Sequence, residues 1–229
     1  MTAASGPRVV RLRSGDLVQT RQVQPRDAPA LAAAYENLGE QSRYRRFFTL
    51  IPELSGTVLT AATDVDHHDH EAFVATPLLG TPAERDQIVA ECRFVRYADR
   101  PDTADLAVTV VDSWQGRGLG TALLDRLSER ASELGIAYFT AEVLAENKAM
   151  LAMLPALGTV ETESFGPVVS AHIAIAAAAR GDIVCIPGPL RRLVQVSDAL
   201  AHIVLLPVTT ALRVLSAPDD EDRPQERPR

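Results

Sequence analysis

The order of hydrophobic and polar residues predicts a mixed protein of strands and helices. Alternating or short apolar runs, bounded by Gly, Pro and charged residues, predict strands at 17–23, 71–75, 88–97, 105–111, 137–143 and 168–175. Apolar residues at helical spacing predict helices at 28–38, 118–134 and 146–157, and a basic, aromatic piece at 42–48 forms a short helical hairpin with the first helix. An antiparallel meander followed by β-α-β units indicates an α/β sheet with helices on its faces.

The pattern becomes less regular after residue 176, which divides the chain into three parts. We expect a folded domain at 17–176 and a partly apolar extension at 177–216 that packs on the domain or on a partner, for instance in a homodimer. The remaining segment, 217–229, is charged and rich in proline, so we expect it to be disordered.

Composition excludes several classes of protein. A hydrophobic content of 46% in 229 residues is enough for a sizeable core, and the net charge of −7 without a basic run argues against a nucleic-acid partner. The most apolar stretch, 199–215, is interrupted by charged and breaking residues and is too short to span a membrane. The N-terminus lacks the apolar core of a signal peptide, and the chain has only two cysteines, so we expect a cytoplasmic protein.

A glycine-rich loop joins the strand at 105–111 to the helix that follows it. Glycines at 116, 118 and 120 let the backbone turn tightly and present N–H groups, and the helix dipole adds positive potential at the same place. Such a turn predicts a pyrophosphate site, to which Arg117 can add a charged contact. The loop does not end in the Gly-Lys-Ser/Thr of a Walker motif. It also lies too late in the chain, with the wrong spacing, for a dinucleotide-binding fold.

The segment Gln-Gly-Arg-Gly-Leu-Gly at 115–120 resembles the acyl-CoA loop of the GNAT superfamily of N-acyltransferases, and Asn147 and Gly158 stand where that superfamily usually has Asn and Gly. The pieces 24–27, 42–48, 69–75 and 141–147 are similar to bacterial Pat-type protein-lysine acetyltransferase domains. The likeness covers residues 17–176. We find no segment similar to the regulatory or ligase domains that often accompany that family, so we do not expect control by a cyclic nucleotide.

The resemblance implies a GNAT-like mixed fold with a central splayed sheet flanked by helices and a C-terminal extension. It also implies that the pantetheine arm of acetyl-CoA enters beside the strand and bonds its backbone. The implied cofactor-binding residues are Val108, Thr109, Val110, Gln115, Gly116, Arg117, Gly118, Leu119, Gly120, Thr121 and Asn147. For Asn147, helix N-capping is an equally good interpretation.

Attack on a thioester needs an amine that has lost a proton, so the site should hold a carboxylate base. Asp105, placed at the start of its predicted strand, is the first candidate, although the related domains resemble Ala-Glu-Val where this chain has the shorter Ala-Asp-Leu. Glu91 is the second candidate. Either acid can instead be solvated, at a strand end for Asp105 and on the outer face for Glu91.

Two further positions bear on the chemistry. The superfamily's usual tyrosine acid would fall at Leu154, so the thiolate must leave with water or without an acid, which a thiol with a pKa of about 8.5 allows. The run His67-His68-Asp69-His70-Glu71 invites a zinc hypothesis, but its spacing does not match a helical zinc motif and we assign no metal.

The sequence thus predicts an acetyltransferase that moves an acetyl group from acetyl-CoA directly to a primary amine. A protein lysine is favoured by the Pat-like pieces. Two alternatives stay open: a small-molecule amine acetyltransferase, and a catalytically weak acetyl-CoA-binding module, which the shorter acid and the missing tyrosine would suit.

Overall fold

The computed structural model describes residues 6–48 and 54–176. Its frame is a single eight-stranded sheet in the order β1-β2-β3-β4-β5-β6-β8-β7. The strands are β1 (Arg8–Arg11), β2 (Leu17–Gln22), β3 (His70–Pro77), β4 (Ala90–Tyr97), β5 (Arg100–Val110), β6 (Tyr138–Leu144), β7 (Gly158–Phe165) and β8 (Val168–Ile175). All neighbours are antiparallel except β5 and β6, which pair in parallel.

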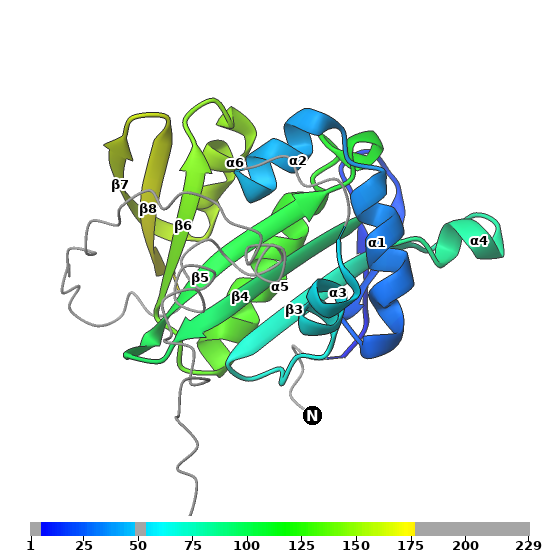
Figure 1. The fold of residues 1–229 in the computed structure, drawn as a ribbon, viewed down its shortest axis with the longest axis horizontal. Helices are drawn as coiled ribbons and strands as arrows, with labels where there is room; N and C mark the ends of the chain where they lie inside the picture. The colour runs from blue at the N-terminus through cyan, green and yellow to red at the C-terminus, as the bar shows by residue number, and fades with distance from the viewer. Residues whose placement is uncertain (1–5, 49–53, 177–229) are drawn as a thin grey trace, which may run out of the picture.

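Helices cover both faces of this sheet (Figure 1). They are α1 (Ala28–Glu36), α2 (Glu40–Phe47), α3 (Gly56–Thr63), α4 (Pro82–Arg85), α5 (Leu119–Glu133) and α6 (Lys148–Met153), with short 3-10 turns at Pro25–Asp27, Asp112–Trp114 and Leu154–Ala156. The helices α1 and α3 lie in front of the sheet in Figure 1 and α5 lies behind it. We call these the α1 face and the α5 face.

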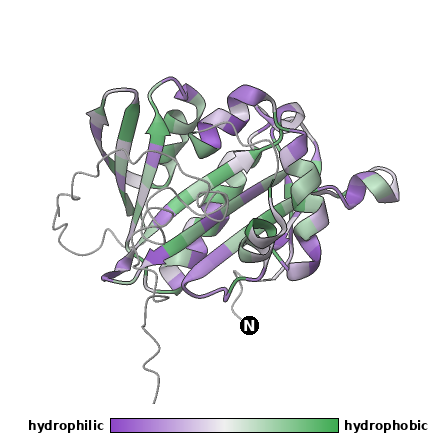
Figure 2. Ribbon diagram, viewed as in Figure 1, coloured by the Kyte–Doolittle hydropathy of each residue, from purple (hydrophilic) through white to green (hydrophobic). Residues whose placement is uncertain are grey.

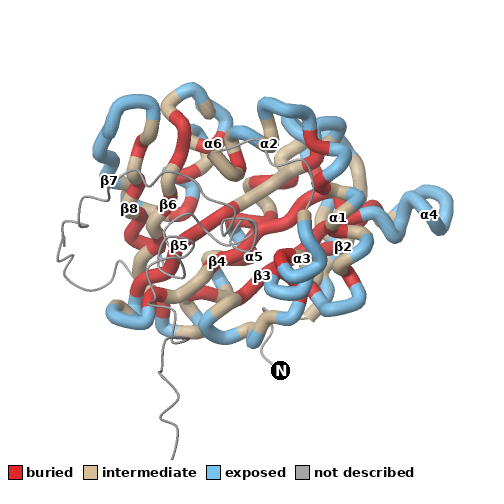
Figure 3. Tube along the Cα trace, viewed as in Figure 1, coloured by how far each residue is buried: buried red, intermediate tan, exposed pale blue. Residues whose placement is uncertain are grey.

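Each face has its own apolar core. The larger core packs α5 and α6 onto the sheet and contains Phe73, Phe94, Leu123, Leu127 and Phe139. The smaller core joins α1 and α3 to the other face of β3 and to Ile88, just before β4. Some hydrophilic positions of the central strands are buried, as a comparison of Figures 2 and 3 shows, because side chains that alternate along a strand enter one core or the other. Glu91, Arg93 and Asp105 lie on the α1 face, whereas Glu71 of β3 pairs with Arg130 of α5.

Most predicted elements are confirmed, with four additions and two changes. The strands β1 and β7 and the helices α3 and α4 had not been predicted, and β1 extends the sheet N-terminal of the expected domain start at residue 17. Gly158 begins β7 as well as ending the preceding helical turn, and the helix expected at 146–157 is divided into α6 and a 3-10 turn containing Pro155. The segments 177–216 and 217–229 lie outside the described residues.

Candidate active site

The strands β5 and β6 diverge in the middle of the sheet. Their parallel pairing covers only Thr103 with Tyr138, Ala104 with Phe139 and Asp105 with Thr140. Beyond Asp105, β5 runs on to Val110 and β6 to Leu144, each still paired with its other neighbour. Neighbouring strands that separate in this way leave main-chain donors and acceptors facing a gap rather than a partner. This gap is the splay that the sequence resemblance implied.

Two residues of β5 present their main chain to the gap. Val111 donates its N–H to Val89 O, on the β4 side, over 2.9 Å. Because main-chain groups alternate along a strand, those of Val108 and Val110 point to the other side, toward β6. Consistent with this, Gln115 Nε2 reaches Val110 O at 3.0 Å. The main chain of Thr109 faces β4 instead.

The glycine loop has the conformation that its sequence predicts. Gly116 has a φ of +72° and Gly118, the N-cap of α5, a φ of +88°, both in the left-handed region where an L-residue is strained. An added Cβ at Gly120 would lie 3.1 Å from Met153 Sδ, so this glycine allows α5 and α6 to pack closely. The N–H groups in the first turn of α5, at Leu119, Gly120 and Thr121, have no acceptor within the helix, as in the first turn of any α-helix, and the positive end of the helix dipole lies at the same place.

Side chains around the loop bind it to other parts of the chain. Arg117 pairs with Asp16 at 2.8 Å, donates to Ser113 O and stacks on the Trp114 ring at 4.7 Å. The turn between β1 and β2 also approaches directly, because Arg13 N donates to Arg117 O at 3.2 Å. The aliphatic part of the Arg13 side chain lies over Gly118, 3.4 Å from where a Cβ would be. An arginine that had not been predicted is thus placed at the N-terminus of α5.

Asp105 occupies a central position rather than the strand end. The strand β5 begins at Arg100, and Asp105 is 1% exposed, which excludes the solvated strand-end acid. It belongs to the last parallel pair, at the point where β5 and β6 separate. The Thr140 hydroxyl lies 3.4 Å from Asp105 Oδ1. Asp105 therefore lies at the closed end of the gap.

Glu91 is also buried, which contradicts its interpretation as a solvent-facing residue. It is 3% exposed, and Arg93 Nε donates to its Oε1. With Ile88 and Thr109 it lines a pocket beneath α1 and α2. Glu91 therefore has a buried cation as its direct partner.

A second buried cation, Arg46 of α2, lies close to both acids. Its Nε donates to Thr109 Oγ1 at 3.1 Å. Burial lowers the pKa of the Arg46 guanidinium to about 10, while the charges of Glu91 and Asp105 act in the opposite direction. Opposite charges on α2, β4 and β5 therefore compensate one another around the gap. The basic and aromatic residues at 42–48 predicted this helix. The sequence did not predict that the Arg46 side chain points toward the two acids.

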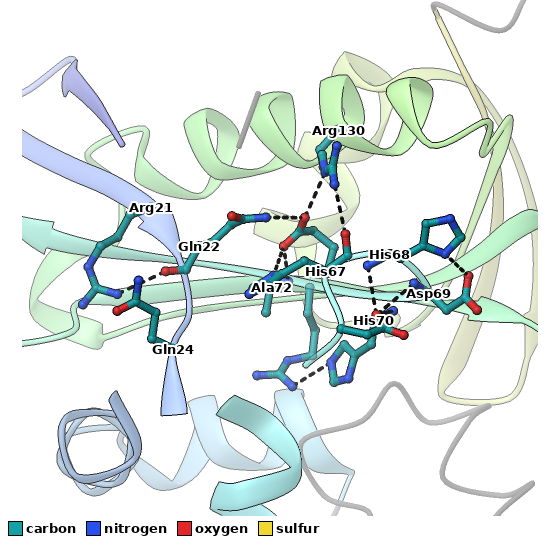
Figure 4. Close-up of polar contacts among 12 residues, drawn as sticks. Arg21, Gln22, Gln24, His67, His68, Asp69, His70, Ala72 and Arg130 are labelled. Carbon is teal, nitrogen blue, oxygen red and sulfur yellow. Dashed lines mark hydrogen bonds and ion pairs between the residues drawn. The ribbon is translucent and has the colours of Figure 1, made fainter. Parts of the chain in front are cut away.

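The three histidines around the start of β3, at 67, 68 and 70, do not converge on one point. Glu71 Oε1 contacts His67 Nδ1 at 2.7 Å, and Asp69 contacts His68. In Figure 4, Arg130 approaches this turn from α5, whereas His70 points to the opposite side of the strand. There the His70 ring lies 3.1 Å from Arg93, and burial together with the Arg93 charge lowers the pKa of His70 to about 3. Among residues 6–48 and 54–176 no group of three or more metal-ligating side chains is found.

Two positions named by the resemblance have structural explanations. Asn147 is the N-cap of α6, and its Oδ1 accepts from Met150 N at 3.2 Å. Leu154 is 1% exposed and belongs to the apolar core on the α5 face. A phenol does occur at the site, from an unexpected element: Tyr97 Oη lies 3.0 Å from Thr140 Oγ1.

Comparison with known proteins identifies the class to which this arrangement belongs. The sequence profile of the acetyltransferase (GNAT) family matches residues 33–158. The chain therefore belongs to this family, whose members are acetyl-CoA-dependent N-acetyltransferases with acetyl-CoA as cosubstrate. Within the described residues, none of the helices has the length and apolar character needed to cross a membrane.

Individual relatives are more specific. Acetyltransferase Pat of Mycolicibacterium smegmatis is 32% identical over 154 residues, which are 67% of this chain and 44% of that protein. An acetyltransferase of Pseudomonas aeruginosa is 29% identical over 66% of this chain and 80% of its own. Among solved structures, the GNAT domain of S. lividans PAT is 30% identical with a TM-score of 0.67, covering 76% of this chain and 99% of that domain. The chain thus spans less than half of the mycobacterial protein and nearly all of the isolated domain.

Proposed function

We propose that this protein transfers the acetyl group of acetyl-CoA to a protein lysine by direct attack of the amine. The observation that carries the proposal is the position of Asp105. This buried carboxylate lies where β5 and β6 separate, and the strand that holds it leads to the glycine loop and the N-terminus of α5. The family uses acetyl-CoA as cosubstrate. We assign its diphosphate, its pantetheine arm and its thioester to separate places in this arrangement.

The diphosphate is assigned to the loop and the first turn of α5. The N–H groups of residues 116–121 and the helix dipole favour an anion there, as at other helix N-termini. Arg13 and Arg117 border the same place, so we include both as partners of the phosphate oxygens. The loop is open beside Gly116, where an added Cβ would meet no atom within 4 Å.

The pantetheine arm is assigned to the gap between β5 and β6. An extended arm that carries amides can replace the missing strand partner, and Val108 and Val110 offer their main-chain groups to it. Thr109 and Asn147 border this region from β5 and from the start of α6. The thioester then comes to lie near Asp105, at the closed end.

Asp105 is assigned as the general base. The acceptor arrives as an ammonium ion and gives one proton to the carboxylate, directly or through water. The free amine forms a bond to the thioester carbonyl carbon, the carbon–sulfur bond breaks, and its electron pair leaves with the thiolate. The attached nitrogen then loses its second proton, which the thiolate takes up directly or through water. Asp105 is preferred over Glu91 because Asp105 lies where β5 and β6 separate, whereas Glu91 lies on β4, which is paired on both sides.

A lysine acceptor is compatible with the charges of this site. Asp105 and Glu91 stand on the same face of neighbouring strands, where Arg46 and Arg93 balance their charges, so no excess positive charge opposes an arriving ammonium ion. The similarity to Pat-type domains points to a lysine on a protein rather than to a small amine. The preference for a protein lysine therefore comes from the relatives, whereas the choice of Asp105 as base comes from its position in the sheet.

The test compares turnover with binding. Release of coenzyme A is measured with a lysine-bearing protein and with free small amines, and calorimetry measures binding of acetyl-CoA. We expect turnover with the protein acceptor, and loss of turnover with retained binding in Asp105→Asn. If small amines react and lysines do not, the acceptor assignment is wrong. Binding without turnover on any amine would favour an acetyl-CoA-binding module.

A further inference from the structure

A chain of two hydroxyl groups, from the buried Tyr97 and the half-buried Thr140, leads from the β4–β5 hairpin to the carboxylate of Asp105. Tyr97 Oη lies 3.0 Å from Thr140 Oγ1, and Thr140 Oγ1 lies 3.4 Å from Asp105 Oδ1. We propose that Tyr97 and Thr140 are positioning residues that hold Asp105 in the orientation and ionisation state of the general base. The proposal rests on the acetyl transfer proposed above.

The direction of the hydrogen bonds follows from the charge of the carboxylate. An ionised Asp105 can only accept, so the Thr140 hydroxyl must donate to it. The Thr140 oxygen is then free to accept from the only proton of the Tyr97 hydroxyl. Each hydroxyl therefore has one orientation, and Tyr97 fixes that of Thr140. The 3.4 Å contact is long for such a bond, and hydrogen bonds of this kind often tighten when substrate binds.

Tyr97 is held in place by its own surroundings. The pairing of β4 with β5 shifts register between Arg96 and Tyr97, a bulge of the kind that re-aims a side chain. The ring is 3% exposed, and the Arg100 guanidinium stacks over it at 4.5 Å. The ring fills space and the hydroxyl satisfies its hydrogen bond at Thr140, and replacement by phenylalanine removes only the hydroxyl. The hydroxyl and the ring can therefore be tested separately.

Several charged groups face Asp105 and must stay constant in the test. On the same face, the row across the sheet runs from His70 on β3 through Asp105 and Thr140 to His172 on β8 and Glu161 on β7. The cation Arg46 approaches from α2, and the Glu91–Arg93 pair lies farther along β4. None of these groups is altered by removing a hydroxyl from Tyr97 or Thr140.

The experiment removes single hydroxyl groups and records the pH dependence of turnover. Thr140→Val should lower the plateau kcat by roughly 10-fold to 100-fold, and should move the acid limb of the profile to higher pH by about one unit. The sign follows because a hydrogen bond donated to a carboxylate favours its charged form, so losing the bond makes ionisation harder. Tyr97→Phe should act in the same direction with a smaller effect.

Three further variants separate positioning from packing. Thr140→Ser keeps the hydroxyl and should restore the wild-type acid limb. The double variant Tyr97→Phe/Thr140→Val should be no worse than Thr140→Val alone, because both changes cut one chain. Tyr138→Phe removes a neighbouring phenol hydroxyl from the same face of β6 and should leave the acid limb in place.

Failure of this inference can be told from failure of the proposed function. The titration of the Asp105 carboxyl carbon is followed by NMR in wild type and Thr140→Val, a measurement that needs no turnover. A higher titration midpoint in Thr140→Val supports the chain. An unchanged midpoint and an unchanged acid limb would mean that Tyr97 and Thr140 only pack. A wild type that turns over no amine would contradict acetyl transfer, while the titration would still decide the role of the hydroxyls.

Discussion

Replacing Gly118 by alanine tests whether the backbone of the glycine loop binds coenzyme A. Gly118 has a φ of +88°, where an L-residue costs roughly 1–2 kcal/mol. An added Cβ would meet only the Arg13 side chain, with Cγ nearest at 3.4 Å, so crowding is minor and backbone strain dominates. We expect the alanine in Gly118→Ala to relax away from positive φ, which turns the N–H groups of the loop away from the ligand. Restoring the binding conformation then weakens binding by about 5-fold to 30-fold.

Gly135 provides a matched control at the other end of the same helix. It has a φ of +76°, and an added Cβ would meet nothing within 4 Å. Alanine also restricts the unfolded chain, which offsets about 0.4–1 kcal/mol of the strain, so Gly135→Ala should lose about 1 kcal/mol net. For a domain of this size, that corresponds to a Tm lower by about 2–4 °C.

Calorimetry with coenzyme A and thermal unfolding of both variants complete this test. Gly118→Ala should lose affinity and, because its backbone relaxes, less stability than Gly135→Ala, whereas Gly135→Ala should lose stability alone. The reasoning is refuted if Gly118→Ala binds coenzyme A as tightly as the wild type while losing as much stability as Gly135→Ala. Equal losses of affinity in both variants would also contradict it, because they would reflect general destabilisation.

Three further predictions concern other parts of the domain. Arg13→Ala should weaken the binding of coenzyme A as measured by calorimetry. An equal loss of affinity for dephospho-coenzyme A would place Arg13 at the diphosphate, and a smaller loss would place it at the 3′-phosphate. No loss with either ligand would show that Arg13 is not part of the site. The pKa of His70 is lowered from 6.5 to about 3, so the unfolded chain binds more protons than the folded chain between these pH values. The free energy of unfolding should therefore fall as the pH drops through this window, and less steeply in His70→Asn. Equal pH dependence of this free energy in both proteins, measured by urea titration, would contradict the prediction. Gly158→Ala should lower the free energy of unfolding by at least about 2 kcal/mol, because its Cβ would lie 1.9 Å from Ala174 O. An unchanged urea midpoint would contradict this prediction and would mean that β7 can shift to accommodate the Cβ.

The local signals in the sequence were sufficient for the loop and its flanking elements. A strand, a turn with three glycines and an amphipathic helix occur in direct succession, and each signal agrees with the next. The structure accordingly has β5, a left-handed Gly118 and α5 in this order. The strands of the meander were predicted for the same reason, with boundaries that differ by a few residues.

The unpredicted elements have weak local signals. The strand β1 has only four residues, two of them arginine, and β7 is largely exposed and polar, so neither has a clear period of two. The start of β5 contains Pro101 and Asp102, which favour a turn, and Asp105 was therefore placed at the strand end instead of the middle. Partners far away in the chain determine these elements.

The polar environment of Asp105 could not be read from sequence at all. Tyr97 and Thr140 are 43 residues apart, and Arg46 reaches Thr109 across 63 residues. No spacing rule connects such residues, because the order of strands in the sheet brings them together. The candidate bases were identified by residue type and strand position, but their burial and their partners required the fold.

The most direct test of the account is mass spectrometry of a lysine-bearing protein incubated with acetyl-CoA and either wild type or Asp105→Asn. General bases contribute about 100-fold to 10,000-fold to a rate. We therefore predict acetylated lysine side chains with the wild type, and a rate of acetylation reduced at least about 100-fold in Asp105→Asn at equal occupancy by acetyl-CoA. Equal acetylation by both enzymes, or none by a wild type that is saturated with acetyl-CoA, would contradict the account.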